Sequence, residues 1–307
     1  MSALAVVSVS VLVACGEDSI GEGSGAPEPG GAGGEATGAG GPGNGGSGNS
    51  DGGGAPSASS TSSGAGAGGN GSGGNPSGSQ CASSRFTWCE DFEGAADGEF
   101  PDGWGPRGDE WGEGTMGVAS DDARFGARSL KVDGGNNGQH FMVRLGGLGA
   151  LASHHYGRVF MKVAVPAPWP QSGVLHADFI EGLGPNNDGG THNVRWGVVE
   201  NTDEKFQWIY NVQPSNAGEW AEGTSYDYQW SGAWQCIEWV YDEPSQSGTL
   251  WIDGQEIPIE PGANHAAEIP VFESLGVGLA NYQDAGEGFT VWFDELAYDD
   301  ARIGCDE

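Results

Sequence analysis

Basic residues are scarce in this sequence. Its 307 residues include 11 Lys and Arg against 43 Asp and Glu, which gives a formal net charge of −32. Because a field of that sign repels phosphate backbones, we expect no nucleic-acid partner. The charge also disfavours a strongly anionic polysaccharide, whereas neutral glycans and divalent cations remain compatible with it.

Several common chemical signatures are missing as well. The sequence contains no nucleophile elbow, no phosphate-binding loop and no zinc-ligand spacing. Its helical periodicity never extends beyond a turn or two. The last of these absences argues against a helical architecture.

The N-terminal apolar run, 3–14, is too short to span a bilayer but fits the hydrophobic region of a signal peptide. It ends in Leu12-Val13-Ala14-Cys15, which resembles the bacterial lipobox, although no basic residues precede the run. We predict a lipoprotein signal peptide over 1–15, lipidation of Cys15, and a location at the bacterial outer membrane or cell surface. Contact with the membrane would then be through the lipid anchor only. The alternative is an ordinary secretory signal that happens to contain a Cys.

Composition divides the rest of the chain. Residues 16–80 are mostly Gly, Ser, Ala, Pro and Asn and include no Lys or Arg, so we predict a disordered linker there. Residues 81–307 hold all twelve Trp and are long enough for one sizeable core. We expect this part to be a single, monomeric domain.

Alternation of apolar and polar residues recurs through 81–307. For example, Val159, Met161 and Val163 share one face of a predicted strand over Tyr156–Val165. Asp253-Gly254 predicts a tight turn after a strand that ends at Ile252. Many short strands with Gly and Pro between them predict an all-β, antiparallel β-sandwich or jelly roll.

The run 289–296 is nearly all apolar but contains Asp294. Alternation places Asp294 on one face with Trp292 and Leu296. A carboxylate in such a strand must be hydrogen-bonded, paired with a cation or bound to a metal, since burying it bare is costly. The position therefore suggests a metal site, and the alternative is an Asp at a strand edge that reaches water.

Four cysteines follow Cys15. An exported chain permits disulfides, and four cysteines allow three pairings. The short spacing favours Cys81 with Cys89, which leaves Cys236 with Cys305.

Five motifs occur in an order and at a spacing that resemble one family. They are Asp91-Phe92-Glu93-Gly94, Gly126-Ala127-Arg128-Ser129-Leu130-Lys131-Val132, Trp234-Gln235-Cys236-Ile237-Glu238-Trp239, Trp292-Phe293-Asp294-Glu295 and Arg302-Ile303-Gly304-Cys305. The chain resembles the core domain of the cellulose-induced secreted proteins of cellulolytic fungi and their bacterial relatives. The resemblance implies a concanavalin A-like jelly roll, similar in fold to glucuronan and alginate lyases.

The resemblance also implies one structural calcium ion between the first strand, a loop and the last strand. The corresponding residues are Glu93, Asp121 or Asp122, and Asp294. Calcium takes six to eight oxygen ligands, so carboxylates from separate elements fit such a site.

A jelly roll of this kind binds sugars on a concave sheet. The residues that we expect to contact carbohydrate are Trp208, Tyr210, Glu238 and Trp239. Similarity to the lyases implies Tyr282 as acid and base, His176 as its assistant, and Arg195 as the partner of a uronate carboxylate. The lyases' full Gln-x-His and Arg-rich motifs are absent, and each of the three residues also suits an ordinary structural role.

We therefore expect an exported, lipid-anchored, carbohydrate-active protein that binds polysaccharide. The alternative is a polysaccharide lyase that cleaves uronic-acid-containing glycans by β-elimination. A glycoside hydrolase would need two facing carboxylates, for which Glu238 and Asp178 are the nearest candidates.

Overall fold

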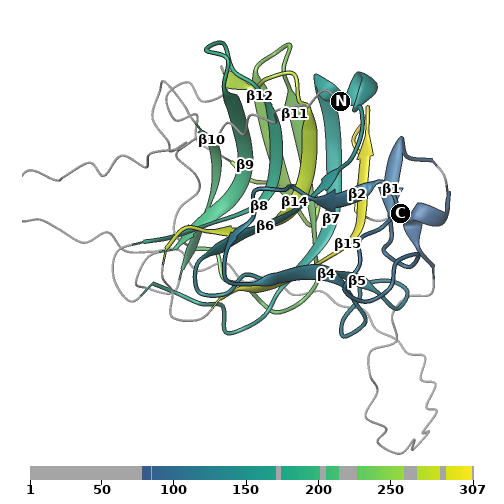
Figure 1. The fold of residues 1–307 in the computed structure, drawn as a ribbon, viewed down its shortest axis with the longest axis vertical. Helices are drawn as coiled ribbons and strands as arrows, with labels where there is room; N and C mark the ends of the chain where they lie inside the picture. The colour runs from purple at the N-terminus through teal and green to yellow at the C-terminus, as the bar shows by residue number, and fades with distance from the viewer. Residues whose placement is uncertain are drawn as a thin grey trace, which may run out of the picture. The chain divides into compact units, whose positions relative to one another are not determined.

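The alternating segments form two antiparallel β-sheets in the computed structural model (Figure 1). The structure describes residues 78–83, 85–170, 174–200, 205–213, 227–258, 268–283 and 288–305, all within one compact unit. The predicted signal peptide, Cys15 and nearly all of the predicted linker lie outside these ranges. Among the residues described, no helix is long and apolar enough to cross a membrane.

The eight-stranded sheet has the order β13-β12-β11-β7-β15-β5-β4, with β1 paired to β15. Its strands are β1 (Trp88–Glu90), β4 (Thr115–Ala119), β5 (Ser129–Asp133), β7 (His154–Val163), β11 (Gln235–Asp242), β12 (Ser247–Ile252), β13 (Gln255–Glu256) and β15 (Thr290–Asp299). The two residues between β12 and β13, Asp253 and Gly254, both have positive φ, as the predicted tight turn requires.

The seven-stranded sheet has the order β10-β9-β8-β14-β6-β2, with β3 paired to β6. Its strands are β2 (Trp104–Pro106), β3 (Trp111–Gly112), β6 (Gly138–Arg144), β8 (Leu175–Pro185), β9 (Thr191–Glu200), β10 (Phe206–Gln213) and β14 (Ser274–Asn281). Two short 3₁₀ turns, η1 (Gln80–Ser83) and η2 (Gly149–Ala152), complete the described elements. The predicted all-β sandwich is confirmed.

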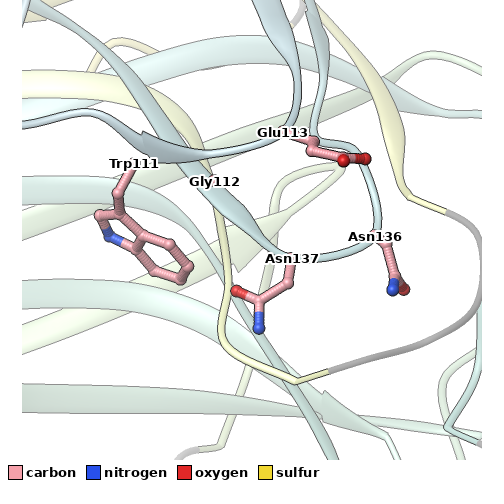
Figure 2. A pocket seen from close by; sticks show the side chains of 5 residues that line it. All are labelled: Trp111, Gly112, Glu113, Asn136 and Asn137. Carbon is pink, nitrogen blue, oxygen red and sulfur yellow. The ribbon is translucent and has the colours of Figure 1, made fainter.

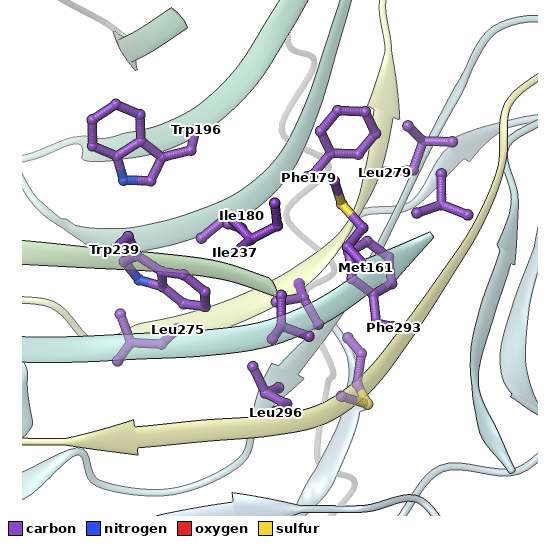
Figure 3. Packing of buried hydrophobic residues seen from close by; sticks show 14 of the residues in the cluster. Met161, Phe179, Ile180, Trp196, Ile237, Trp239, Leu275, Leu279, Phe293 and Leu296 are labelled. Carbon is purple, nitrogen blue, oxygen red and sulfur yellow. The ribbon is translucent and has the colours of Figure 1, made fainter. Parts of the chain in front are cut away.

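Both sheets contribute side chains to one apolar core. Met161, Trp239 and Phe293 from the eight-stranded sheet pack in the same cluster as Phe179 and Trp196 from the seven-stranded sheet (Figure 3). Burial of such side chains contributes about 1.5–3 kcal/mol each for a Leu- or Phe-sized group. The core therefore fixes which face of each sheet is turned outward, and the outer faces carry the polar groups discussed below.

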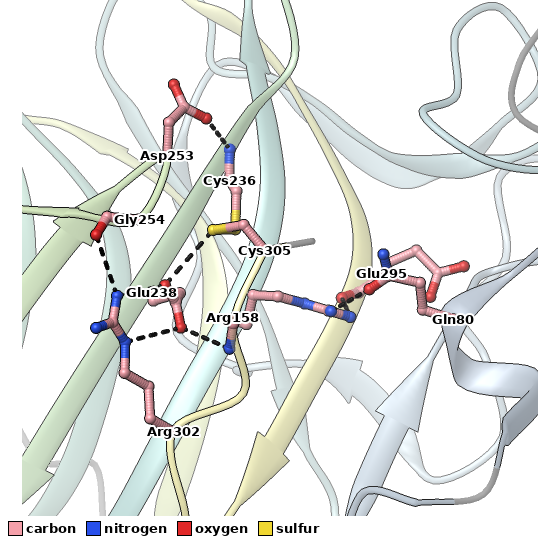
Figure 4. Close-up of a disulfide and its surroundings, with 10 residues drawn as sticks. Gln80, Arg158, Cys236, Glu238, Asp253, Gly254, Glu295, Arg302 and Cys305 are labelled. Carbon is pink, nitrogen blue, oxygen red and sulfur yellow. Dashed lines mark hydrogen bonds and ion pairs between the residues drawn. A yellow bond between two sulfur atoms is a disulfide. The ribbon is translucent and has the colours of Figure 1, made fainter. Parts of the chain in front are cut away.

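Both predicted disulfides are present. Cys81 is bonded to Cys89, and Cys236 to Cys305. The second joins β11 to the C-terminal segment over a sequence separation of 69 residues (Figure 4).

Strand β15 departs from simple alternation after Asp294. The register shifts between Asp294 and Ala297, and Glu295 has a φ of 53°. Because of this bulge, Leu296 enters the core while Asp294 lies outside it. The prediction that Asp294 and Leu296 share a face is therefore wrong.

Candidate functional site

The outer face of the seven-stranded sheet gathers buried polar side chains from neighbouring strands. On β8, Ala177 and Phe179 point into the core, so His176 and Asp178 point outward. A bulge between Asp178 and Ile180 shifts the register against both neighbouring strands. The extra residue also turns Glu181 outward, which places three ionisable groups of one strand on the same face.

Asp178 is the centre of a buried hydrogen-bonded cluster. Its Oδ2 lies 2.7 Å from Nη1 of Arg195 on β9, and its Oδ1 lies 2.9 Å from Nε2 of His176. Arg195 also donates from Nη1 to the hydroxyl of Tyr282, which follows β14. The Tyr282 ring lies against that of His176, with 5.0 Å between the ring centroids. The structure thus brings together the three residues predicted to be catalytic.

Gly197 leaves the space that this cluster needs. It pairs with Asp178 across β8 and β9. A Cβ atom at position 197 would lie 2.4 Å from Oδ1 of Asp178 and 2.3 Å from the carbonyl oxygen of Ala177. Any larger residue would therefore displace the carboxylate that holds Arg195 and His176.

The cluster controls the protonation of its members. Burial alone would raise the pKa of Asp178, but Arg195 and His176 hold it below its ordinary value. Burial, reinforced by the charge of Asp178, raises the pKa of Tyr282 above its ordinary value. The phenol is therefore protonated at neutral pH and can donate a proton, whereas a phenolate base is disfavoured.

A second ion pair lies farther along the same face. Arg107, which follows β2, contacts Glu181 at 2.5 Å and also pairs with the more exposed Asp109. Asn193 Nδ2 donates to Glu181 at 3.2 Å. Burial raises the pKa of Glu181 to about 7, although Arg107 and Asn193 oppose the rise. Each arginine on this face is thus matched by a buried carboxylate.

Several hydrogen-bonding atoms on this face have no partner among the described residues. They are Oε1 of Glu181, Oδ1 of Asn193, Nε and Nη2 of Arg195, and both amide atoms of Asn211, which is opposite Arg195 on β10. Buried polar groups almost always have a protein, water or ligand partner. This sheet therefore holds a row of buried donors and acceptors that water or a polar ligand would satisfy.

Three aromatic residues predicted to contact carbohydrate are not on an outer face. Trp208, Tyr210 and Trp239 are at most 5 % exposed and belong to the core between the sheets. The prediction for these residues is wrong because aromatic side chains on a strand suit a core as well as a sugar platform. An exposed tryptophan that the sequence reasoning missed, Trp111, packs instead against Tyr282 at the outer face, with 6.1 Å between the rings.

Glu238 has a structural role on the other sheet. Its carboxylate pairs with Arg302 at 2.9 Å (Figure 4). It also accepts a hydrogen bond from the backbone N–H of Gly304 at 2.8 Å. It lies on the outer face of the eight-stranded sheet, so the core separates it from Asp178. Its assignment to a carbohydrate site is therefore wrong, and the two carboxylates do not form a hydrolase pair.

Two of the predicted calcium ligands accept hydrogen bonds from backbone N–H groups. Asp294 accepts backbone hydrogen bonds from Arg124, Phe125 and Glu295, and Glu93 accepts them from Ala127 and Arg128.

The two loop aspartates contact side chains. Asp121 pairs with Lys131 at 2.8 Å, and Asp122 pairs with Lys162. No three of the four predicted ligands bring carboxylate oxygens within 4.8 Å of one another in the described chain. Asp294 and Glu93 thus contact one loop, 121–128, to which Asp121 and Asp122 belong.

The fold and this face define a class: a jelly-roll sandwich with a polar, partly aromatic outer sheet face. No family model matches the sequence, and no curated protein matches it.

Among solved structures, the chain is similar to a cellulose-induced protein, Cip1, with 22 % identity and a TM-score of 0.49 over 71 % of this chain and 99 % of that chain. It is also similar to an alginate lyase, Aly36B, at 12 % identity and a TM-score of 0.36, over 58 % and 82 % of the two chains. The receptor-binding domain of botulinum neurotoxin D gives 10 % identity and a TM-score of 0.39 over 62 % and 45 %. A cellulose-induced protein and an alginate lyase are thus among the similar structures, as the sequence motifs suggested.

Proposed function

We propose that this domain binds polysaccharide on the outer face of its seven-stranded sheet. The observation that supports the proposal is the row of buried donors and acceptors without partners on Glu181, Asn193, Arg195 and Asn211. Sugar hydroxyls both donate and accept, so a glycan can satisfy such a mixed row. Trp111 and Tyr282 add the aromatic surface on which sugar rings pack.

Charge favours a neutral glycan. Arg195 is paired with Asp178, and Arg107 is paired with Glu181 and Asp109. The two positive charges are therefore already matched, and the whole chain is strongly acidic. A polyuronate would meet little net attraction on this face.

A panel of neutral and uronic-acid polysaccharides, titrated with the full chain, tests the proposal. We expect binding to at least one neutral glycan and about tenfold weaker binding by Asn211→Ala, because one buried hydrogen-bonding group is removed. Thr249→Ala deletes a polar group from the outer face of the other sheet and is the matched control. No binding to any polymer, or equal losses in both variants, would contradict the proposal.

A second function, β-elimination, is favoured by the cluster of Tyr282, His176 and Arg195. The contact of His176 Nε2 with Asp178 orients the imidazole, which suits His176 as the group that takes the α-proton. Protonated Tyr282 would donate to the leaving oxygen. Arg195 would stabilise the carboxylate of the substrate through its unpartnered Nη2 and Nε.

The same panel tests this second function when it is followed for unsaturated sugar ends. If the domain is a lyase, Tyr282→Phe should lower turnover by about 10² to 10⁴-fold, since one positioned acid is lost. Glycan affinity should stay within about tenfold, because a single hydroxyl is worth about 1 kcal/mol. The absence of unsaturated ends from every uronate polymer with the wild-type chain would exclude the lyase.

Calcium binding by Glu93, Asp294 and a loop Asp remains a prediction from the sequence. An ion that binds only the folded state stabilises it by RT ln(1 + [L]/Kd). If the prediction holds, EDTA lowers the melting temperature of the full chain, added calcium restores it, and Asp294→Ala abolishes the response. A melting temperature that chelation leaves unchanged would contradict the prediction.

Attachment to the membrane through Cys15 would hold the binding face outside the cell, which suits a protein that captures extracellular polymers. This part of the proposal rests on the lipobox-like sequence Leu12-Val13-Ala14-Cys15. Mass spectrometry of the protein purified from its native membrane would test it. An acylated N-terminal cysteine is expected, and a free N-terminus at another residue would contradict it.

A further inference from the structure

A pocket lies beside the Tyr282 cluster at one edge of the seven-stranded sheet. Its volume is about 460 Å³, and its lining consists of Trp111, Gly112, Glu113, Asn136 and Asn137. Figure 2 shows the Trp111 ring on one side and the side chains of Glu113 and Asn136 on the other, with Asn137 between them. An aromatic face opposite a carboxylate and two amides is a combination that suits a sugar ring.

Backbone contacts fix the shape of the pocket. Strand β3 pairs with β6 through Trp111 and Gln139, and the N–H of Glu113 donates to the carbonyl of Asn137 at 3.2 Å. Gly112 has a φ of 77°, and a Cβ atom there would lie 2.1 Å from the carbonyl oxygen of Asn137. Only glycine allows the two walls to approach this closely.

The opposite wall is held by Asn281 at the end of β14. Its side-chain Nδ2 donates to the backbone carbonyl of Asn136 at 3.0 Å, and Asn281 itself is fully buried. The pocket is therefore built by three elements that are held by hydrogen bonds. A preformed site loses little entropy when a ligand binds.

Two lining groups are not fully satisfied by contacts within the described part of the protein. Trp111 is 39 % exposed, unlike the tryptophans of the core. Oδ1 of Asn137 is buried and has no hydrogen-bond partner among the described residues. Trp111 also touches Tyr282, so the pocket continues the aromatic surface of the outer face.

We infer that this pocket is a subsite for one neutral pyranose residue of a bound glycan, an inference that rests on the proposed polysaccharide-binding function. The apolar face of the sugar packs on Trp111, and one of its hydroxyls bonds to the amide of Asn137. The carboxylate of Glu113 accepts hydroxyl hydrogen bonds and repels a uronate. The subsite thus selects a neutral residue next to the Tyr282 cluster.

Titration calorimetry of the full chain with a soluble neutral β-glucan, a neutral mannan and a polyuronate tests the subsite. We expect Trp111→Ala to weaken binding of the preferred neutral glycan about tenfold or more, and Trp111→Phe to weaken it about threefold, as central aromatic contacts do at other interfaces. The matched control is Trp169→Ala, which removes a tryptophan of similar exposure away from this face. It should leave affinity unchanged. Unaltered melting temperatures show that the variants are folded.

The contribution of the Glu113 charge is measured by the preference for neutral glycan over polyuronate. Glu113→Gln should raise the ratio of polyuronate affinity to neutral-glycan affinity by about tenfold, since a repulsive charge is lost. Binding that persists unchanged in Trp111→Ala, or that weakens equally in Trp169→Ala, would overturn the subsite while leaving the proposed function intact. A wild-type chain that binds no glycan would instead overturn the proposed function and the subsite with it.

Discussion

Replacing Asp178 with alanine should destabilise the domain by about 3–5 kcal/mol, because it leaves the charge of Arg195 buried and unpaired. Arg195 is 1 % exposed and lies 2.7 Å from Asp178, and His176 loses its 2.9 Å partner as well. Asp109→Ala is the control, since that carboxylate also pairs with an arginine but is 62 % exposed at its side chain. It should cost less than about 1 kcal/mol.

Urea unfolding of the full-length variants measures both effects. Combining Asp178→Ala with Arg195→Met should recover part of the lost stability, because no unpaired charge then remains in the site. Equal effects of Asp178→Ala and Asp109→Ala would contradict the buried cluster. So would a double variant that is as unstable as the sum of its single substitutions.

Removal of the Cys236–Cys305 disulfide is the second change with a large expected effect. The sequence separation of 69 residues corresponds to about 4 kcal/mol in the chain-entropy description of disulfides. The separation of 8 residues between Cys81 and Cys89 corresponds to about 2.5 kcal/mol. The serine pair at 236 and 305 should therefore lower stability more than the serine pair at 81 and 89.

Urea unfolding under oxidising conditions separates the two disulfide variants. The same variants unfolded in a reducing buffer should differ little from reduced wild-type protein. The opposite order of stabilities, or recovery of free thiols at Cys236 and Cys305 from oxidised wild type, would contradict the prediction.

Long strands could be predicted from the sequence because alternation identifies them without knowledge of their partners. The strand predicted over Tyr156–Val165 corresponds to β7 (His154–Val163), and the final strand was found within a few residues. Short edge strands could not be found in this way. The Gly and Pro residues in and around Trp104–Pro106 indicate a turn. The segment nevertheless forms strand β2, because its pairing with β6 outweighs local propensity.

The candidate site could be predicted only in part. His176 and Arg195 lie on long strands, and Tyr282 follows one, so their side chains could be assigned to a common face. The sequence predicts Asp178 as a polar group of the sheet and as half of a hydrolase pair, but it does not indicate Arg107 or Glu181. Arg107 follows a short edge strand, and Glu181 reaches this face only through a bulge that no local pattern reveals.

The aromatic residues of β10 also show why alternation alone does not identify a binding face. On β10, Trp208 and Tyr210 face the core, whereas Asn211 faces outward. Alternation separates these two sets but does not say which one is buried. The packing of the second sheet determines which face is buried. It places Trp208 and Tyr210 in the core, although the sequence predicted that they contact carbohydrate.

The bulge in β8 shifts the alternation of inward- and outward-facing residues by one position within the strand. Before Phe179 the even-numbered residues His176 and Asp178 face outward, whereas after it the odd-numbered Glu181 does. Deleting Phe179 would therefore remove the bulge and restore regular alternation, in which Ile180 still faces the core and Glu181 still faces outward. A residue-by-residue alignment of this sheet with that of another jelly roll should therefore treat the residues before and after Phe179 separately. Otherwise Glu181 will be aligned with core positions.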